Sequence, residues 1–589
     1  MWRKVRIAVC MASLAFFIMA CGMCRADGGY GGRGFVNFDA TGFFRVERYD
    51  LAWWFVTPDG LPFYSMGVCS VQPVGDNAPS LGYAPYHRNV LAKHGSEEAW
   101  MESARSRLEG WGFNTLGGWS NRGVGLPWFA IMYFGSVWQE GTVDDFFSPE
   151  FDRLADETIK NEVKPDDKSL IGYFFNNEMQ WETDWRRGKP LFYLYMTFEP
   201  DAPGKVAIVE FMKRRYGSVA AMGAVWSPGV AGWEEFASLK EIEPVPGAED
   251  AAREDREDFT LMAARRYFRV ATETMRRYDP NHLIAGSRFI SWTTPAAVVI
   301  AAGEYLDVVS VNHYELGPLG KQTFNNLNAS VTPAGGDPSF ENYYRLARRP
   351  LMVTEFGFRS MDSGLPNTWP PPVLVQPTVP TQAARAKKYA RYARGWAKRS
   401  YFVGHHWFKF MDEPKEGRFD GENGNYGLVN IEDEPYGKFV DAVSEVNDGV
   451  WKLHRESGQA MSLLDATIKR LKPTLDVKRE FMAESCDALS SLEMITACKF
   501  ASLMVEAREN GESRLIVSGE DGVVEFAYGE GDRYVKYYSS LKLFAEGLIE
   551  ELADIADSEL PMFGTGVPGF AYRVRRAADG EEKFFVDLM

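Results

Sequence analysis

The sequence contains few cysteines, and this shortage excludes two classes of protein. Only six of the 589 residues are cysteine, and three of these fall within the first 24 residues. The other three, Cys69, Cys486 and Cys498, are too few and too scattered for a disulfide framework, and their spacing matches no zinc motif. A Cys486–Cys498 bridge and two separate thiols both remain open.

Basic charge is also in short supply. Lys and Arg total 65 against 81 Asp and Glu, which gives a formal net charge of -16. No run rich in Lys or Arg offsets this balance, so we expect no nucleic-acid partner. The composition is otherwise that of a globular chain, 45% hydrophobic and 25% charged, with a high aromatic fraction of 14%.

Long hydrophobic runs are absent except at the N-terminus. Three basic residues within the first six positions precede an apolar stretch at residues 7–20, shorter than the roughly 20 residues of a membrane span. This pattern predicts a bacterial export signal over residues 1–26. Cleavage before Cys21 would leave a surface lipoprotein anchored in the membrane there, whereas cleavage after Ala26 would release a secreted or periplasmic protein.

Eight apolar, β-rich runs recur along the chain, and helical patterns separate several of them. Strands that are apolar throughout and alternate with helices predict a parallel sheet covered on its outer face. Eight such units predict a (β/α)8 TIM barrel. An open doubly wound sheet is the alternative, but no Gly-rich nucleotide fingerprint follows the first strand. The runs lie at residues 62–68, 111–117, 128–134, 170–175, 282–288, 305–312, 350–356 and 401–408.

Two segments depart from the eightfold pattern. Residues 182–280 separate the fourth and fifth runs and carry their own helical patterns, which predicts an inserted helical segment beside the barrel mouth. From residue 456 the texture changes to helices followed by strands with Gly turns. We therefore expect a signal at 1–26, a barrel at 27–455 and a small C-terminal α+β region without an assigned role at 456–589.

Two glutamates end buried strands of the predicted barrel. The fourth run leads into Asn176-Asn177-Glu178, and the seventh, "PLMVTEFG", ends at Glu355. The carboxyl ends of barrel strands carry function, and a buried carboxylate is costly unless it is used or paired. A lone glutamate there is most often a structural ion-pair partner, and Asn is common in turns. Two glutamates together favour glycoside cleavage, which uses a pair about 5 Å apart in retaining enzymes.

The motifs "GYFFNNEMQW", "VNHYE", "PLMVTEFG" and "GHHWFKF" together resemble clan A of the glycoside hydrolases, which are retaining (β/α)8 enzymes. The resemblance implies that Glu178 is the acid/base and Glu355 the nucleophile. It also implies that Asn177 binds the sugar 2-hydroxyl, that Tyr314 orients Glu355, and that Trp407 forms the floor under the sugar.

Over residues 44–445 the chain is similar to the β-agarases of glycoside hydrolase family 50, and "FMKRRYGSVAAMGAVWSPGVAGWEEF" resembles a segment of clan A β-galactosidases. The resemblance implies cleavage of a galactan-type polysaccharide or oligosaccharide, with carbohydrate as the partner and no organic cofactor. The alternatives are a β-galactosidase, β-glucanase or β-mannanase, a non-catalytic carbohydrate-binding protein, and a structural envelope lipoprotein. The oligomeric state is not indicated.

Four further residues each have two interpretations. Asn114 and Trp119, after the second strand, contact substrate on the family resemblance or serve core and turn roles. His313 lines the donor subsite or is a structural histidine. Arg288, at the end of the fifth run, binds substrate or pairs with Glu178 or a neighbouring acid.

Metal chemistry has little support. His405 and His406 are adjacent, so on a strand they point to opposite faces, and no third ligand is near them in sequence. The oxygen-rich loop "GRFDGENGNYGLVN" does not have the spacing of a calcium loop, and we expect it to face the substrate. We predict no metal site.

Overall fold

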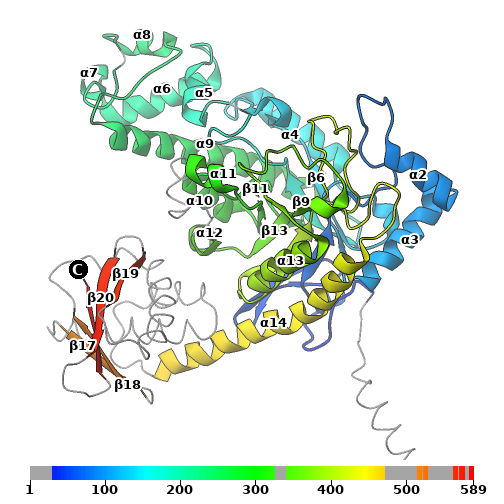
Figure 1. Ribbon diagram of the computed structural model, residues 1–589. Coiled ribbons are helices and arrows are strands. Elements are labelled where there is room, and N and C mark those ends of the chain that lie inside the picture. Colours follow the sequence, from blue (N-terminus) through cyan, green and yellow to red (C-terminus); the bar gives the residue numbers. More distant parts are fainter. Residues whose placement is uncertain are drawn as a thin grey trace, which may run out of the picture.

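The computed structural model describes residues 29–186, 188–227, 229–324 and 340–470, together with five strands between residues 514 and 588 (Figure 1). The expected export signal, the lipidation candidate Cys21, and the Cys486 and Cys498 thiols lie outside the described residues. Cys69 is buried and carries a free thiol.

A curled parallel sheet of nine strands forms the centre of the molecule, in the order β10-β9-β6-β5-β4-β16-β13-β12-β11. Its end strands, β10 (Leu283–Ile284) and β11 (Phe289–Ile290), are two halves of one segment. β10 pairs with β9, and β11 pairs with β12. The Ile284 carbonyl also accepts a hydrogen bond from Asp307 N at 3.0 Å, just before β12. The sheet therefore returns to its starting segment, in the manner of a TIM-like barrel.

The predicted strands correspond closely to this sheet. Three of them, β9, β13 and β16, are buried at every position because helices cover one face and packed side chains fill the other. Besides β10 and β11, the strands of the sheet are β4 (Ser65–Val68), β5 (Thr115–Leu116), β6 (Trp128–Met132), β9 (Leu170–Phe175), β12 (Val309–Asn312), β13 (Leu351–Phe356) and β16 (Phe402–Trp407).

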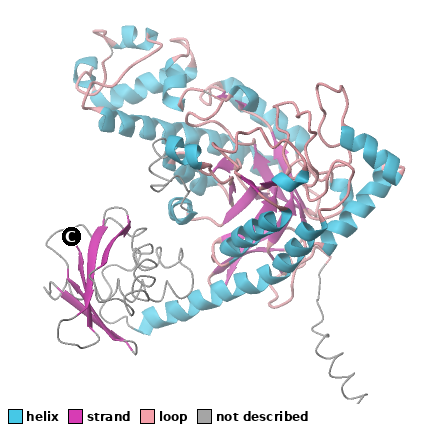
Figure 2. Cartoon of the chain, in the orientation of Figure 1, coloured by secondary structure: helices cyan, strands magenta, loops and turns pink. Residues whose placement is uncertain are grey.

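Helices cover the outer face of the sheet (Figure 2). Helices α13 and α14 pack against each other, and α9 packs against both α4 and α10. An antiparallel sheet of β1 (Arg45–Tyr49), β2 (Ala52–Val56) and β3 (Pro62–Phe63) precedes the first barrel strand. The helices of this part of the chain are α2 (Pro85–His94), α3 (Glu97–Gly110), α4 (Pro149–Glu162), α9 (Glu249–Tyr278), α10 (Ala296–Tyr305), α11 (Pro318–Phe324), α12 (Phe340–Ala347), α13 (Gln382–Ala397) and α14 (Gly437–Arg470).

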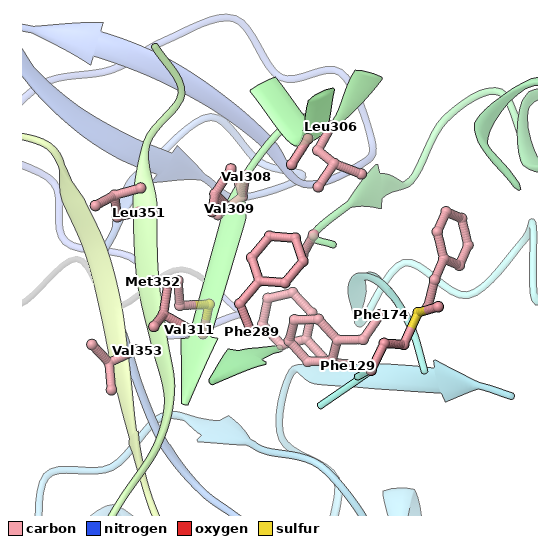
Figure 3. Packing of buried hydrophobic residues seen from close by; sticks show 14 of the residues in the cluster. Phe129, Phe174, Phe289, Leu306, Val308, Val309, Val311, Leu351, Met352 and Val353 are labelled. Carbon is pink, nitrogen blue, oxygen red and sulfur yellow. The ribbon is translucent and has the colours of Figure 1, made fainter. Parts of the chain in front are cut away.

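Aromatic side chains lie in the interior of the sheet. The rings of Phe129 and Phe174 stack there with centroids 4.7 Å apart (Figure 3). Phe289, Val311 and Val353 (Figure 3) instead face the covering helices, and Phe289 packs against Phe268 of α9 with ring centroids 6.2 Å apart. The interior is therefore packed, and chemistry is confined to the strand ends.

Between β9 and α9 the chain forms four short helices that stand at one end of the molecule (Figure 1). They are α5 (Leu191–Met196), α6 (Pro203–Tyr216), α7 (Val219–Met222) and α8 (Trp233–Ser238). They occupy the segment where an insertion was expected. No helix within the described ranges is both long and apolar enough to span a bilayer.

In the C-terminal region, the expected domain boundary at 455/456 falls inside α14. The strands described beyond it form one sheet in the order β17-β18-β21-β20-β19. They are β17 (Arg514–Gly519), β18 (Gly522–Ala527), β19 (Met562–Val567), β20 (Phe570–Arg576) and β21 (Lys583–Leu588).

Close strand packing at Gly172 gives a first prediction. A Cβ at this position of β9 would lie 2.4 Å from the Leu283 carbonyl oxygen, which is backbone and cannot move aside. We expect Gly172→Ala to destabilise the fold by about 1–3 kcal/mol, seen as a melting temperature lower by several degrees. Gly449→Ala in α14, which meets no atom within 4 Å, is the matched control and should not lower the melting temperature.

Candidate active site

Glu178 stands just beyond the C-terminal end of β9 in a strained backbone conformation. Its φ is 51°, in the left-handed region that glutamate rarely adopts, and the φ of Asn176 is 60°. The buried Asn176 amide accepts from Phe134 N at 2.9 Å and donates to Tyr267 Oη at 2.8 Å. Asn176 thus fixes the backbone where the chain leaves the strand. The surrounding structure holds Glu178 at a positive φ that is unfavourable for a residue with a side chain.

Glu355 lies near the end of β13, with 4% of its surface exposed. Its Oε2 accepts from Tyr314 Oη at 2.7 Å, and its Oε1 accepts from Asn312 Nδ2 at 2.8 Å. The Arg288 guanidinium also donates to Oε1 in a buried ion pair. Three donors converge on this carboxylate, an arrangement that suits an anion held in a fixed orientation.

One amide joins the two glutamates. Asn312 Nδ2 lies 2.8 Å from Glu355 Oε1 and 3.0 Å from Glu178 Oε1. These two distances limit the separation of the carboxyl oxygens to at most about 5.8 Å, their sum. The two glutamates therefore lie close together in space, although they are 177 positions apart in the chain.

The Glu178 carboxyl is poised to hold a proton near neutral pH. Burial, and secondly the negative charge of Glu355, raise the pKa of Glu178 to about 7. Hydrogen bonds from Asn312 and from Trp138 Nε1, the latter at 3.2 Å to Oε2, oppose the rise. Trp138 lies in a short 3-10 helix, η2 (Trp138–Glu140), on a loop between β6 and β9.

Arg288 lies in the break between β10 and β11, with φ 51° and a fully buried side chain. Besides pairing with Glu355, it donates from Nε to Asn177 Oδ1 at 2.8 Å. Its guanidinium carbon lies 4.7 Å from the Trp119 ring centroid and 5.3 Å from that of Phe174. Of the two interpretations for Arg288, the geometry matches pairing with a neighbouring acid.

Aromatic side chains border the carboxylates. Trp119, at φ 61° and 37% exposed, donates from Nε1 to Tyr133 Oη at 2.7 Å. Phe408 meets the Trp119 ring edge-on at 6.3 Å and the Tyr314 ring at 6.2 Å. Phe419, 62% exposed, lies 6.5 Å from Trp138. Trp119 and Phe419 therefore expose apolar surface near the two glutamates, whereas Phe408 is buried behind Trp119 and Tyr314.

The structure places Trp407 away from the position expected for it. Trp407 is fully buried, donates from Nε1 to Tyr426 O at 2.9 Å, and packs against Tyr389 of α13 and Phe439 of α14. Because neighbouring strand residues face opposite ways, its side chain lies on the helix-covered outer face. The residue on the site side is the next one, Phe408.

Two other candidates lie apart from the carboxylates. The Asn114 amide accepts from Met66 N at 2.9 Å and donates to Tyr64 O at 3.0 Å, which ties the starts of β4 and β5 together at the opposite end of the barrel. His313 Nδ1 lies 3.0 Å from Ser291 Oγ among aromatic rings, and burial lowers the pKa of His313 to about 4. Both geometries match the structural interpretation.

The histidine pair and the oxygen-rich loop have structural partners. His406 Nε2 lies 2.9 Å from Ser65 Oγ inside the barrel, whereas His405 packs against Tyr389 outside it, so the two do face opposite ways. In the loop, Arg418 forms ion pairs with Glu422 and neighbouring acids. Across the described part of the chain, no three His, Cys, Asp or Glu side chains gather as metal ligands.

Sequence reasoning missed Asn312, Trp138 and Phe408. Asn312 is the last residue of β12, so the rule that strand ends carry function could have found it. Trp138 lies on an irregular loop that no periodic pattern marks. Phe408 was missed because the aromatic pair 407–408 allows either register.

A barrel-like parallel sheet with two buried glutamates at its C-terminal end is the architecture of glycoside hydrolases that use a carboxylate pair. The chain is similar to β-agarase B of Vibrio sp. (strain JT0107), 27% identical over 496 residues, and to β-agarase A of the same organism, 29% identical over 410 residues. The matches cover 70% and 64% of this chain but 49% and 39% of those proteins, so the chain spans about half or less of their length.

Solved structures agree on the fold. The crystal structure of the agarase AgWH50C is 25% identical with a TM-score of 0.61, covering 75% of this chain and 70% of that chain. An exo-β-agarase structure, 24% identical, has a TM-score of 0.60 and covers 73% and 67%. No protein-family model matches the sequence.

Burial of Glu178 predicts an unusual dependence of stability on pH. Because the folded pKa of about 7 exceeds the unfolded value near 4.5, the folded state binds more protons between these pH values, and its stability falls as pH rises through that window. Glu178→Gln removes this loss. Between pH 4.5 and pH 8, we expect the free energy of unfolding of the variant to rise by about 3 kcal/mol relative to that of the wild type. Melting temperatures of both proteins at the two pH values measure this difference. Glu241→Gln, at an exposed position, is the control, and it should change the melting temperature by the same amount at pH 4.5 and at pH 8.

Proposed function

We propose that the protein is an exported, retaining β-glycoside hydrolase that acts on a galactan-type polysaccharide or its oligosaccharides. The observation that carries the proposal is the shared Asn312 donor, which keeps Glu178 Oε1 within about 5.8 Å of Glu355 Oε1. Inverting enzymes need roughly 6.5–9.5 Å between the carboxyl groups, to leave room for water, whereas retaining enzymes use about 5–5.5 Å.

In the first half-reaction, Glu355 attacks the anomeric carbon as the glycosidic C–O bond breaks, and Glu178 gives its proton to the departing oxygen. In the second, Glu178 takes a proton from water, the water oxygen attacks the anomeric carbon, and the bond to Glu355 breaks. The negative charge of Glu355 contributes to the raised pKa of Glu178. Esterification removes that charge and so lowers the pKa of Glu178. The ionised form of Glu178 is then available to act as the base in the second step.

Neighbouring groups position the substrate and the nucleophile. Tyr314 holds Glu355 through Oε2. The oxygen of the Asn177 amide is taken by Arg288 and Asn312, so its NH2 is the group that Asn177 offers to a sugar hydroxyl. The exposed Trp119 face suits the apolar side of a sugar ring, with Phe408 beside it.

The choice of a galactan rests on the similarity to β-agarases along most of this chain. The curled sheet supports a (β/α)8 barrel with the α5–α8 segment inserted after its fourth strand. The N-terminal basic and apolar residues support export, with Cys21 lipidation or cleavage after Ala26 as the two routes.

The carboxylate variants test the reaction. Purified protein should release reducing sugar from a β-linked galactan in a panel that also holds β-glucans, β-mannans and aryl β-galactosides. We expect Glu178→Gln and Glu355→Gln each to lose at least about 1,000-fold in kcat while keeping the wild-type circular dichroism, because each removes one half of the acid and nucleophile pair.

Glu182→Gln, in the same loop as Glu178, is the matched control and should stay active. Proton NMR should show that the product first released has the same anomeric configuration, β, as the glycosidic bond that was cleaved. Activity that persists in both carboxylate variants would refute the site, and wild-type binding without turnover on the whole panel would favour a binding protein.

The pKa of Glu178 sets the basic limb of the pH profile. The protonated form is needed to expel the leaving group, so kcat/KM should fall as pH rises through about 7. Aryl glycosides with good leaving groups need less proton donation, so Glu178→Gln should retain more activity on them and lose this limb. A limb that stays near pH 7 in Glu178→Gln would assign it to another group.

A further inference from the structure

Asn312 occupies a position that no other described residue shares. It is the last residue of β12, almost fully buried, and its Nδ2 reaches Glu355 Oε1, Glu178 Oε1 and, at 3.2 Å, Asn177 Oδ1. An amide NH2 has two hydrogens, so three acceptors cannot all be served at once.

The amide is held with its NH2 toward the acids. Thr354 Oγ1 donates to Asn312 Oδ1 at 2.8 Å, and Thr354 is fully buried beside Glu355 on β13. A flipped amide would place its oxygen against Glu355 Oε1 and leave that carboxylate without the Asn312 donor. The orientation therefore follows from the network, and only small rotations of the NH2 are needed to change partners.

The other polar contacts of the pair are one-sided. Among the described residues, Arg288 and Tyr314 hydrogen-bond to Glu355, and Trp138 hydrogen-bonds to Glu178. Asn312 alone in this part of the chain bonds both carboxylates. A donor that contacts one glutamate can stabilise a negative charge on that glutamate only, whereas Asn312 can stabilise a negative charge on either one.

We propose that Asn312 is a positioning residue for both half-reactions, whose NH2 follows the negative charge from Glu355 to Glu178 and back. The inference rests on the proposed double displacement. In the free enzyme the charge is on Glu355, and the shorter bond, 2.8 Å, goes there. Once Glu355 is esterified and Glu178 has given up its proton, the charge lies on Glu178, and the donor turns to Glu178 Oε1, 3.0 Å away.

Single-turnover and burst kinetics, on a substrate that the wild type cleaves, measure the rates of glycosylation and deglycosylation separately. Asn312→Leu, which keeps the approximate shape and removes the donor, should slow both glycosylation and deglycosylation by about 10- to 100-fold, the usual effect of losing a hydrogen bond to a charged group. Tyr314→Phe, whose hydroxyl contacts Glu355, should slow glycosylation more than deglycosylation. If Asn312→Leu slows one step only, or neither, the inference is wrong.

Thr354→Val provides a second variant that leaves both carboxylates and the amide in place. It releases the orientation of the Asn312 amide, so both steps should slow by a smaller, similar factor. If both rates stay at wild-type values, the proposed anchoring of the amide is wrong.

A titration separates this inference from the proposed function. Carbon-13 NMR of glutamate-labelled protein, with Glu178→Gln assigning the signal, should show the Glu178 midpoint rising in Asn312→Leu, because a donor to the charged form is gone. This measurement needs no turnover. A wild type inert on every substrate would refute the proposed function, whereas an unmoved midpoint in a folded Asn312→Leu would refute the role of Asn312.

Discussion

Two buried carboxylates that share one amide donor set the conditions for the whole site. Glu178 and Glu355 are each less than a tenth exposed, and their Oε1 atoms lie within about 5.8 Å of each other. Two negative charges in such a place repel each other and lose their hydration. The protein meets this cost in two ways: it keeps a proton on Glu178 near neutral pH, and it surrounds Glu355 with Arg288, Tyr314 and Asn312.

The supporting groups come from breaks in the barrel strands. Residues with positive φ, Trp119, Glu178 and Arg288, all follow or interrupt strands of the central sheet. Each conformation is costly for a residue with a side chain, by about 1–3 kcal/mol, and is held because the packed sheet over-determines it. The split between β10 and β11 is the clearest example, since it places the Arg288 guanidinium inside the barrel, above the Phe129 and Phe174 layer.

The same physical arrangement links stability and proposed chemistry. A carboxyl group whose pKa is raised to about 7 destabilises the folded state above that pH, yet it is the group that can both give and take a proton during a double displacement. The site is thus a region of the molecule where local strain and buried charge are tolerated because the surrounding core is large. The exposed aromatics beside it cover the polar groups with flat apolar surfaces that suit sugar rings.

The sequence by itself determined the eight apolar runs, their alternation with helices, and the two glutamates at strand ends, because burial on both faces leaves a continuous apolar signature and a carboxylate after such a run is conspicuous. The family resemblance added a proposed role for each glutamate. Tertiary structure alone decided which side chains meet. Trp407 and Phe408 are neighbours in sequence, but the strand pleat sends one outward to α13 and α14 and the other to the site. The position of Asn312 at a strand end can be read from the sequence, but its contacts cannot, because they depend on three acceptors that follow or end two other strands and that only the closing of the sheet brings within hydrogen-bond distance.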